Sequence, residues 1–458
     1  MRNDLFATAV AAVVALVATG ERAQARDSAT HEDVAAVRAQ VAALSERLDR
    51  LEASNLTLQA ENSALRTEVE RRNAETEYLK AQTQELRGEV ASASSEVARV
   101  KGADWTTRLK ARGDFRYRHE SIETERIVAT GAAEAVEDAA DRYRHRIRAR
   151  LGFDATVTDS VGVTTLFATG GDEPRSSNQT LGTSGSRKSI GLDMAYLDWR
   201  FMRGAQVVLG KQPWPFWRPG QSLFFDVDYN AEGGAVKFER GMLFGSAYGW
   251  WLTEQYDADP DGENSDTNVF GLQTGLEFPL FGGETRVAVH YYDCGACQGN
   301  SPLYANNANG NTTFRDGTGT TNYLAYDYDI LELAAQLDVT VFDLPLAFWV
   351  NYAQNVAPGV EYDEAYGVGV LLGKASKPRA WEAGLLYQSI DRDALFGQFI
   401  DGDFGSGITD SEGWVLKAGY APVRNITFNA VYFMNTLGQD FGTELDYDRL
   451  QFDLNYRF

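Results

Sequence analysis

The last ten residues, 449–458, read Arg-Leu-Gln-Phe-Asp-Leu-Asn-Tyr-Arg-Phe and alternate without a break between polar and apolar side chains. Successive side chains of an extended strand point to opposite faces, so one face of this segment is apolar and the other is polar. The same two-residue period recurs in residues 329–341, 346–355 and 426–435. The pattern predicts strands that meet an apolar environment on one side and water on the other.

Working back from this end, sixteen segments between residue 105 and the C-terminus are strand candidates. They are 105–119, 142–158, 160–170, 189–203, 205–213, 231–240, 242–255, 267–279, 283–293, 328–341, 344–356, 363–374, 379–391, 411–422, 424–435 and 447–458. Tight turns and long loops alternate between them. This layout predicts an all-β transmembrane fold, a sixteen-stranded antiparallel up-and-down β-barrel like those of the bacterial outer membrane. A soluble sandwich also alternates in polarity, but it gives no reason for the alternation in loop length.

The N-terminus predicts export from the cytoplasm. Arg2 precedes an apolar run over residues 5–18, and the small-residue site Ala23-Gln24-Ala25 follows. This is typical of a secretory signal peptide, so residues 1–25 are predicted to be removed. The mature chain then divides into residues 26–104 and the barrel, residues 105–458.

A heptad pattern runs from Val34 to Val100, with mostly aliphatic residues at the a and d positions in its first half. This pattern predicts a coiled coil, because a lone helix would leave its apolar seam in water. At 1.5 Å per residue the rod is roughly 100 Å long. Asn55 and Asn62 occupy successive a positions and are expected to fix the register of the oligomer.

The formal charge of −22 argues against nucleic acid as a partner, since nucleic acid needs a basic surface. The only cysteines, Cys294 and Cys297, lie in the longest loop of an exported protein, and we expect a disulfide between them. The four histidines form no metal-ligand pattern. We expect no cofactor and no metal site.

Three further segments carry a family resemblance: Gly210-Lys211-Gln212-Pro213-Trp214-Pro215-Phe216-Trp217, then Phe225-Asp226-Val227-Asp228-Tyr229-Asn230-Ala231-Glu232-Gly233, then the terminal Tyr456-Arg457-Phe458. With the heptads, they make the whole mature chain resemble the Gram-negative putative porin family, in which a coiled coil precedes a sixteen-stranded barrel. The phosphate-selective porins are a further relative to consider. The resemblance implies a homotrimer of water-filled channels among outer-membrane lipids. It also implies that the barrel-assembly machinery reads the C-terminal Phe458.

Basic residues share one face of each of the first two strand candidates. They are Arg108, Lys110, Arg112, Arg116 and Arg118, followed by Arg142, Arg144, Arg146, Arg148 and Arg150. A cation facing lipid near the midplane costs about 2–4 kcal/mol, so these side chains are expected to line the lumen as one basic wall.

The third long loop, 214–230, is expected to fold inward and carries Asp226 and Asp228, with Glu232 just beyond. Acids facing a basic wall would set up a transverse field across a constriction and favour small hydrophilic solutes over apolar ones. The alternatives are that the charges only solvate the lumen, or pair with neighbouring acids such as Asp114 and Asp154, or form an anion-selective ladder.

The sequence therefore predicts an outer-membrane porin for passive diffusion of small hydrophilic solutes and ions, with the coil in the periplasm. An anion- or phosphate-selective porin and a structural anchor whose coil reaches toward peptidoglycan are the alternatives. A barrel enzyme is disfavoured, because no Ser or Thr stands out beside a His as a nucleophile with its base. The sign of the ion selectivity stays open.

Overall fold

The computed structural model describes residues 31–103, 105–130, 133–254, 266–315, 317 and 321–458. The signal-peptide prediction, residues 1–25, lies outside the described residues. The chain divides into two compact units, Met1–Lys101 and Gly102–Phe458.

Among its described residues the first unit consists of one helix, α2 (His31–Ala103), which is 73 residues long. The side chains at the heptad core positions between residues 37 and 97 are all exposed, and Leu44, Leu51 and Leu65 are each more than 60% exposed. The helix therefore presents an apolar seam that no other described residue covers. None of the helices in the described residues is long and apolar enough to cross a membrane.

The second unit begins with the short helix η1 (Trp105–Arg108) and contains twenty strands among its described residues. These are β1 (Leu109–Thr130), β2 (Ala133–Asp138), β3 (Arg142–Thr156), β4 (Val161–Thr169), β5 (Gln179–Thr180), β6 (Ile190–Met202), β7 (Ala205–Pro213), β8 (Asn230–Arg240), β9 (Leu243–Thr253), β10 (Thr267–Leu280), β11 (Gly283–Gly295), β12 (Thr313–Phe314), β13 (Tyr323–Leu324), β14 (Asp329–Val341), β15 (Leu344–Asn355), β16 (Glu364–Gly373), β17 (Trp381–Ile390), β18 (Ser411–Val423), β19 (Ile426–Leu437) and β20 (Leu445–Arg457).

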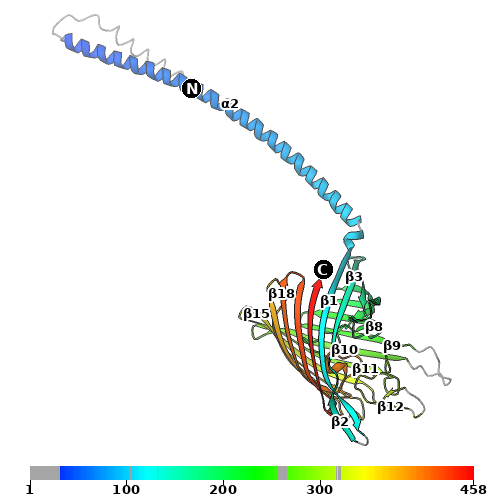
Figure 1. Ribbon diagram of the computed structural model, residues 1–458. Coiled ribbons are helices and arrows are strands. Elements are labelled where there is room, and N and C mark those ends of the chain that lie inside the picture. Colours follow the sequence, from blue (N-terminus) through cyan, green and yellow to red (C-terminus); the bar gives the residue numbers. More distant parts are fainter. Residues whose placement is uncertain (1–30, 104, 131–132, 255–265, 316, 318–320) are drawn as a thin grey trace. The chain divides into compact units, whose positions relative to one another are not determined.

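Sixteen of these strands form a closed antiparallel barrel, so the predicted fold is confirmed (Figure 1). Each strand pairs with the next barrel strand along the chain, and β20 returns to pair with β1 from Arg457 opposite Asp114 to Tyr447 opposite Thr124. The short elements β2, β5, β12 and β13 lie in the long loops. Closure pairs every edge, which is the condition for a sheet to stand in lipid.

The first strand differs most from the sequence prediction, and it does so at both ends. Residues 105–108 form η1 rather than the start of a strand. At its other end β1 runs on to Thr130 and pairs with β2, within residues 120–141, which were predicted to be a long loop. The apolar cross-strand pair of Ile127 and Val136 explains this extension, since such pairs stabilise a two-stranded ribbon.

The two faces of the barrel wall differ in polarity as the alternation requires. Outward side chains such as Leu272 and Leu333 are exposed and apolar, whereas their inward neighbours Gln273 and Glu332 are buried and polar. Two long loops fill part of the lumen. Loops 214–229 and 391–410 contribute to a large buried apolar cluster inside the barrel.

Aromatic contacts join these two loops to the wall. The ring of Trp214 lies 5.1 Å from that of Trp250 on β9 and 5.3 Å from that of Phe399 on loop 391–410. Aromatic pairs at such distances add to the stabilisation from area burial. The loops are therefore packed structural parts of the lumen.

Candidate functional site

The candidate site lies on the inner wall where the first, second and last barrel strands meet. In the register of β1 and β3, Arg116 stands opposite Arg148, and Arg118 stands opposite Arg146. These four side chains, together with Arg144 and Arg150, are buried or half-buried on the inner face. We call these six arginines and Arg449 of β20 the basic wall.

The remaining four predicted cations lie away from this group. Arg108 belongs to η1 and so precedes the strand row, while Lys110, Arg112 and Arg142 are exposed towards the strand ends. Arg449 was not among the predicted cations, although the alternation of residues 449–458 already put it on the polar face. Closure brings it to Ile122 of β1 in the register of the seam.

Three carboxylates of the strands themselves interleave with the basic wall. Asp114 contacts Arg148 at 3.0 Å and Arg150 at 2.7 Å. Asp453 contacts Arg118 at 2.7 Å.

The third of these carboxylates is Glu120, which is fully buried. It contacts Arg449 at 2.6 Å and Arg146 at 3.6 Å and also pairs with Arg144. The wall is thus a network of paired charges, which lowers the cost of holding so many arginines in one place.

Two more carboxylates reach the wall from inward loops. An oxygen of Asp228, on loop 214–229, lies 3.5 Å from Arg148 and 3.6 Å from Arg150. Asp403, on loop 391–410, lies 3.0 Å from Arg118 and 2.7 Å from Arg449. Burial by itself would raise the pKa of Asp403, but Arg449 and Arg118 outweigh it and hold that pKa well below its usual value. Both acids therefore touch the basic wall directly instead of facing it across water.

Asp226 has a different place from its neighbour Asp228. It is only 4% exposed, and its carboxylate accepts hydrogen bonds from the backbone N–H groups of Asp228 (2.7 Å) and Gly402 (2.8 Å). Burial, with Asp401 and Asp228 close by, raises the pKa of Asp226 well above its usual value. Its role in this geometry is to join loop 214–229 to loop 391–410.

Glu232 does not join the other two acids. It lies on β8 with the parity of the outward Val236, its side chain is 65% exposed, and it pairs with Lys211 of β7 at 2.9 Å. The expectation that it faces the basic wall is corrected for this reason. Strand alternation from residue 230 onward determines its direction, and loop 214–229 does not carry it.

Polar side chains of the far wall hold loop 214–229 across the lumen through its backbone. Gln273 accepts from the N–H of Trp217 and donates to its carbonyl, both at 2.8 Å. Gln336 accepts from the N–H of Gly220 at 2.6 Å.

Gln388 accepts from the N–H of Leu223 at 3.2 Å, and Asn351 donates to the hydroxyl of Ser222 at 2.9 Å. These partners, with Gln273 and Gln336, lie on β10, β14, β15 and β17. Loop 214–229 therefore spans from its own strands to the opposite side of the barrel.

Arg175 fixes loop 391–410 in a comparable way. Arg175 is 7% exposed, and its guanidinium donates hydrogen bonds to the carbonyls of Gly397 (3.2 Å), Ile400 (3.3 Å) and Gly407 (2.9 Å). Nothing in the local sequence around Arg175 or Asp403 signals these roles, because both depend on how two long loops fold.

Other predicted features lie away from the basic wall. Cys294 and Cys297 form a disulfide at the end of β11, with a Cα–Cα distance of 5.6 Å. His290 lies between Tyr248 (2.7 Å) and Glu332 (3.0 Å) on the inner wall, in contact with Phe216. Among the described residues, no group of His, Cys, Asp and Glu is arranged to hold a metal ion.

The model of the putative porin family matches this chain over residues 9–318 and 296–458. The chain belongs to the putative porin family. No curated protein matches it. The barrel of this family member is similar to the high-pH structure of OprB from Pseudomonas putida, with 12% identity and a TM-score of 0.50, covering 77% of this chain and 95% of that one.

Two further solved porins are similar at lower scores. A triple mutant of the Rhodopseudomonas blastica porin has 11% identity and a TM-score of 0.41, covering 76% of this chain and all of that one. Salmonella typhi OmpF in complex with daunomycin has 11% identity and a TM-score of 0.42, covering 76% and 97%. Identities this low bear on the fold alone. Family and fold together support a porin of the bacterial outer membrane.

Proposed function

We propose that this porin lets small hydrophilic solutes and ions diffuse passively through the barrel, past a constriction where loops 214–229 and 391–410 meet the basic wall. The observation that carries the proposal is the delivery of Asp228 and Asp403 to that wall by two inward loops. Fixed charges of both signs at a narrow passage orient dipolar solutes and exclude apolar ones.

The balance of charge at this constriction favours an anion-selective channel as a second candidate. Seven arginines form the basic wall, whereas five carboxylates contact it: Asp114, Glu120, Asp453, Asp228 and Asp403. The Nε atoms of Arg146 and Arg449 are buried without a hydrogen-bond partner among the described residues. A net positive wall attracts anions more than cations.

Planar-bilayer recording in a salt gradient tests both candidates. Stepwise conductance in KCl is expected, with a reversal potential on the anion side. A protein that inserts without conducting would overturn the diffusion role. Conductance with a reversal potential on the cation side would overturn the second candidate alone.

We further propose that α2 forms a coiled coil that joins three barrels in the periplasm. The exposed aliphatic seam supports this, because association would remove it from water, and Asn55 and Asn62 lie within it. Light scattering in mild detergent is expected to give a trimer, and a monomer would refute the proposal. A coil of this length could also reach toward peptidoglycan, which co-sedimentation with cell-wall sacculi would test.

The C-terminal residue supports one more part of the proposal, recognition by the barrel-assembly machinery. The backbone of Phe458 exchanges hydrogen bonds with Gly113 at 3.0 and 3.1 Å, while its ring stays 57% exposed. The ring is therefore accessible on the strand that closes the barrel. Deleting Phe458 is expected to lower assembly in cells without preventing refolding in detergent.

A further inference from the structure

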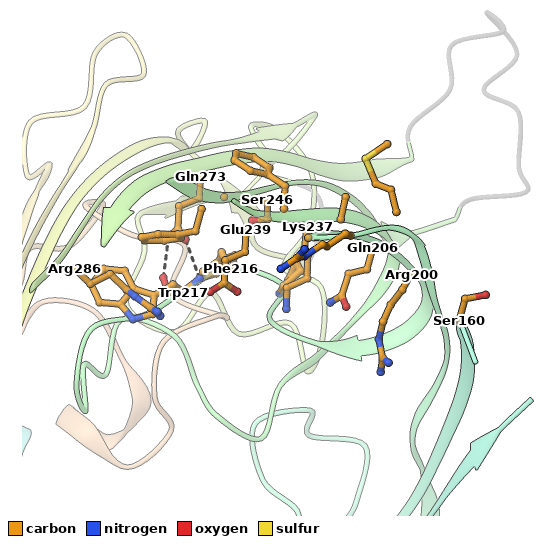
Figure 2. A pocket seen from close by; sticks show the side chains of 18 of the residues that line it. Ser160, Arg200, Gln206, Phe216, Trp217, Lys237, Glu239, Ser246, Gln273 and Arg286 are labelled. Carbon is orange, nitrogen blue, oxygen red and sulfur yellow. Dashed lines mark hydrogen bonds between the residues drawn. The ribbon is translucent and has the colours of Figure 1, made fainter. Parts of the chain in front are cut away.

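We infer that a binding site for small aromatic carboxylates lies on the inner wall beneath loop 214–229, towards the end of the barrel where the tight turns lie. The site is a cavity of about 730 Å³, within the size range of small-molecule pockets (Figure 2). The inference rests on the proposed function, in which a solute that enters the barrel passes this inner wall. It concerns a different wall from the constriction.

A row of polar side chains in register forms one side of the cavity. Gln206 of β7 stands opposite Lys237 of β8, Lys237 opposite Ser246 of β9, and Ser246 opposite Gln273 of β10. The amide of Gln273 is occupied by the backbone of Trp217, as the dashed lines in Figure 2 show. The first three members of the row face the cavity instead of the loop.

The hydroxyl of Ser246 and the ammonium of Lys237, both in this row, make no hydrogen bond with the described residues. Ser246 is 1% exposed, yet its hydroxyl has no hydrogen-bond partner among the described residues. The ammonium of Lys237 makes no hydrogen bond or ion pair with any residue that the structure describes. A buried hydroxyl and a cation on adjacent strands are the groups that bind a carboxylate, which accepts from both. Burial without a partner is costly, so a ligand here would satisfy them.

Aromatic side chains cover the other side of the cavity. Phe216 and Trp217 enter from loop 214–229 and Phe244 from β9. The guanidinium of Arg286 lies 4.9 Å from the ring centroid of Phe244 and 5.7 Å from that of Trp217. These planar groups suit a planar apolar portion of the solute, by stacking and cation–π contact.

The charge of the lining agrees with an anionic ligand. The lining holds the cations Arg200, Arg203, Lys237 and Arg286 and the acids Asp159 and Glu239. Two of these cations have acids of their own beside the lining, since Arg200 lies 3.8 Å from Asp198 and Arg286 pairs with Glu277. Among the described residues no carboxylate lies within ion-pair distance of Lys237 or Arg203, although Asp198 acts on Lys237 from further away. Lys237 is the one of the two that stands in the polar row.

Benzoate is the probe for this site, with benzyl alcohol as a ring without charge and acetate as a charge without a ring. The full-length porin is recorded in planar bilayers in KCl while each probe is added. Benzoate is expected to block the current at a lower concentration than either comparison compound. Losing one charge-assisted hydrogen bond weakens binding about tenfold or more. Lys237→Met is therefore expected to raise the half-blocking concentration of benzoate about tenfold, and Ser246→Ala severalfold.

Lys377→Met is the matched control, because it removes an equal charge from an exposed turn outside the cavity. It is expected to leave the block by benzoate unchanged. A conducting wild-type channel that benzoate does not block better than benzyl alcohol would overturn the inference, as would equal block of Lys237→Met and wild type. If the wild type does not conduct, the proposed function fails instead. Equilibrium dialysis of radiolabelled benzoate against the solubilised protein then decides the site, with binding lost in Lys237→Met as the supporting result.

Discussion

Replacing Asp403 by Asn tests whether loop 391–410 contributes to the constriction. The substitution keeps the shape of the side chain and removes one negative charge from between Arg118 and Arg449. Each of these arginines keeps a second carboxylate, Asp453 at 2.7 Å and Glu120 at 2.6 Å. The change therefore exposes positive charge at the wall without leaving an arginine wholly unpaired.

The expected size of the effect follows from Coulomb's law. Two unit charges 4 Å apart interact by about 1 kcal/mol in bulk water and about 4 kcal/mol at an effective dielectric constant near 20. Since 1.4 kcal/mol is tenfold, the lower limit already corresponds to about a fivefold change in the ratio of anion to cation permeability. Breaking a buried ion pair costs about 3–5 kcal/mol, and the remaining partners of Arg118 and Arg449 bring the expected loss of stability to the lower end of that range.

The assay is the reversal potential of Asp403→Asn in a KCl gradient, with Asp343→Asn as the control. Asp343 is exposed at the tight turn between β14 and β15 and has a positive φ of 63°, which Asn also tolerates. Its charge is screened beyond about 8 Å at physiological salt. Asp403→Asn is expected to shift the reversal potential towards anions, and Asp343→Asn to leave it unchanged. The reasoning is refuted if the control shifts the potential as much as Asp403→Asn does.

Three further predictions concern the loops and the helix. Burial and the neighbouring acids raise the pKa of Asp391 to about 6, so folding favours its protonated form, and the stability of the protein should increase as pH falls from 7 to 4. Asp391→Asn should raise the thermal unfolding temperature at pH 7 and remove this part of the pH dependence. An unchanged pH profile would contradict the assignment. Deleting residues 31–100 should leave a foldable barrel and lower the temperature at which the oligomer dissociates on gels, whereas an unchanged temperature would show that the barrels alone hold it together. Mass spectrometry should find Cys294 and Cys297 joined to each other, and replacing both by Ser should leave conductance within error, because they lie away from the basic wall.

The barrel could be predicted from the sequence because lipid and water impose a period of two on every strand. Residues 449–457 of β20 alternate without exception, and the arginines of β1 and β3 all fall on one parity of their strands, so the inward face of each was readable. The same alternation could have been used to predict that Glu232 points outward, since it has the parity of Val236. Arg449 was equally visible as a polar-face residue, but only closure of the last strand on the first brings it to the wall.

The paths of the loops could not be read in this way. No periodic pattern marks loop 391–410, and Asp403 gains its role only when that loop lies beside Arg118, nearly three hundred residues away in sequence. The hydrogen bond from the N–H of Leu223 to the side chain of Gln388 likewise joins segments that are distant in sequence. Such contacts depend on the assembled barrel and on side-chain packing, neither of which leaves a local signal.

The ion pairs across the pairing of β1 with β20 also bear on how accurately the barrel closes. Arg118 with Asp453 and Glu120 with Arg449 join the two ends of the barrel sequence on its inner side. If the last strand joined one residue out of step, its polar residues would turn towards lipid, since a one-residue slip reverses every side chain. Exposing one arginine near the midplane costs about 2–4 kcal/mol. By itself that penalty favours correct closure by roughly thirtyfold to seven-hundredfold. The charges that we propose to filter solutes thus also favour the correct register when the last strand pairs with the first.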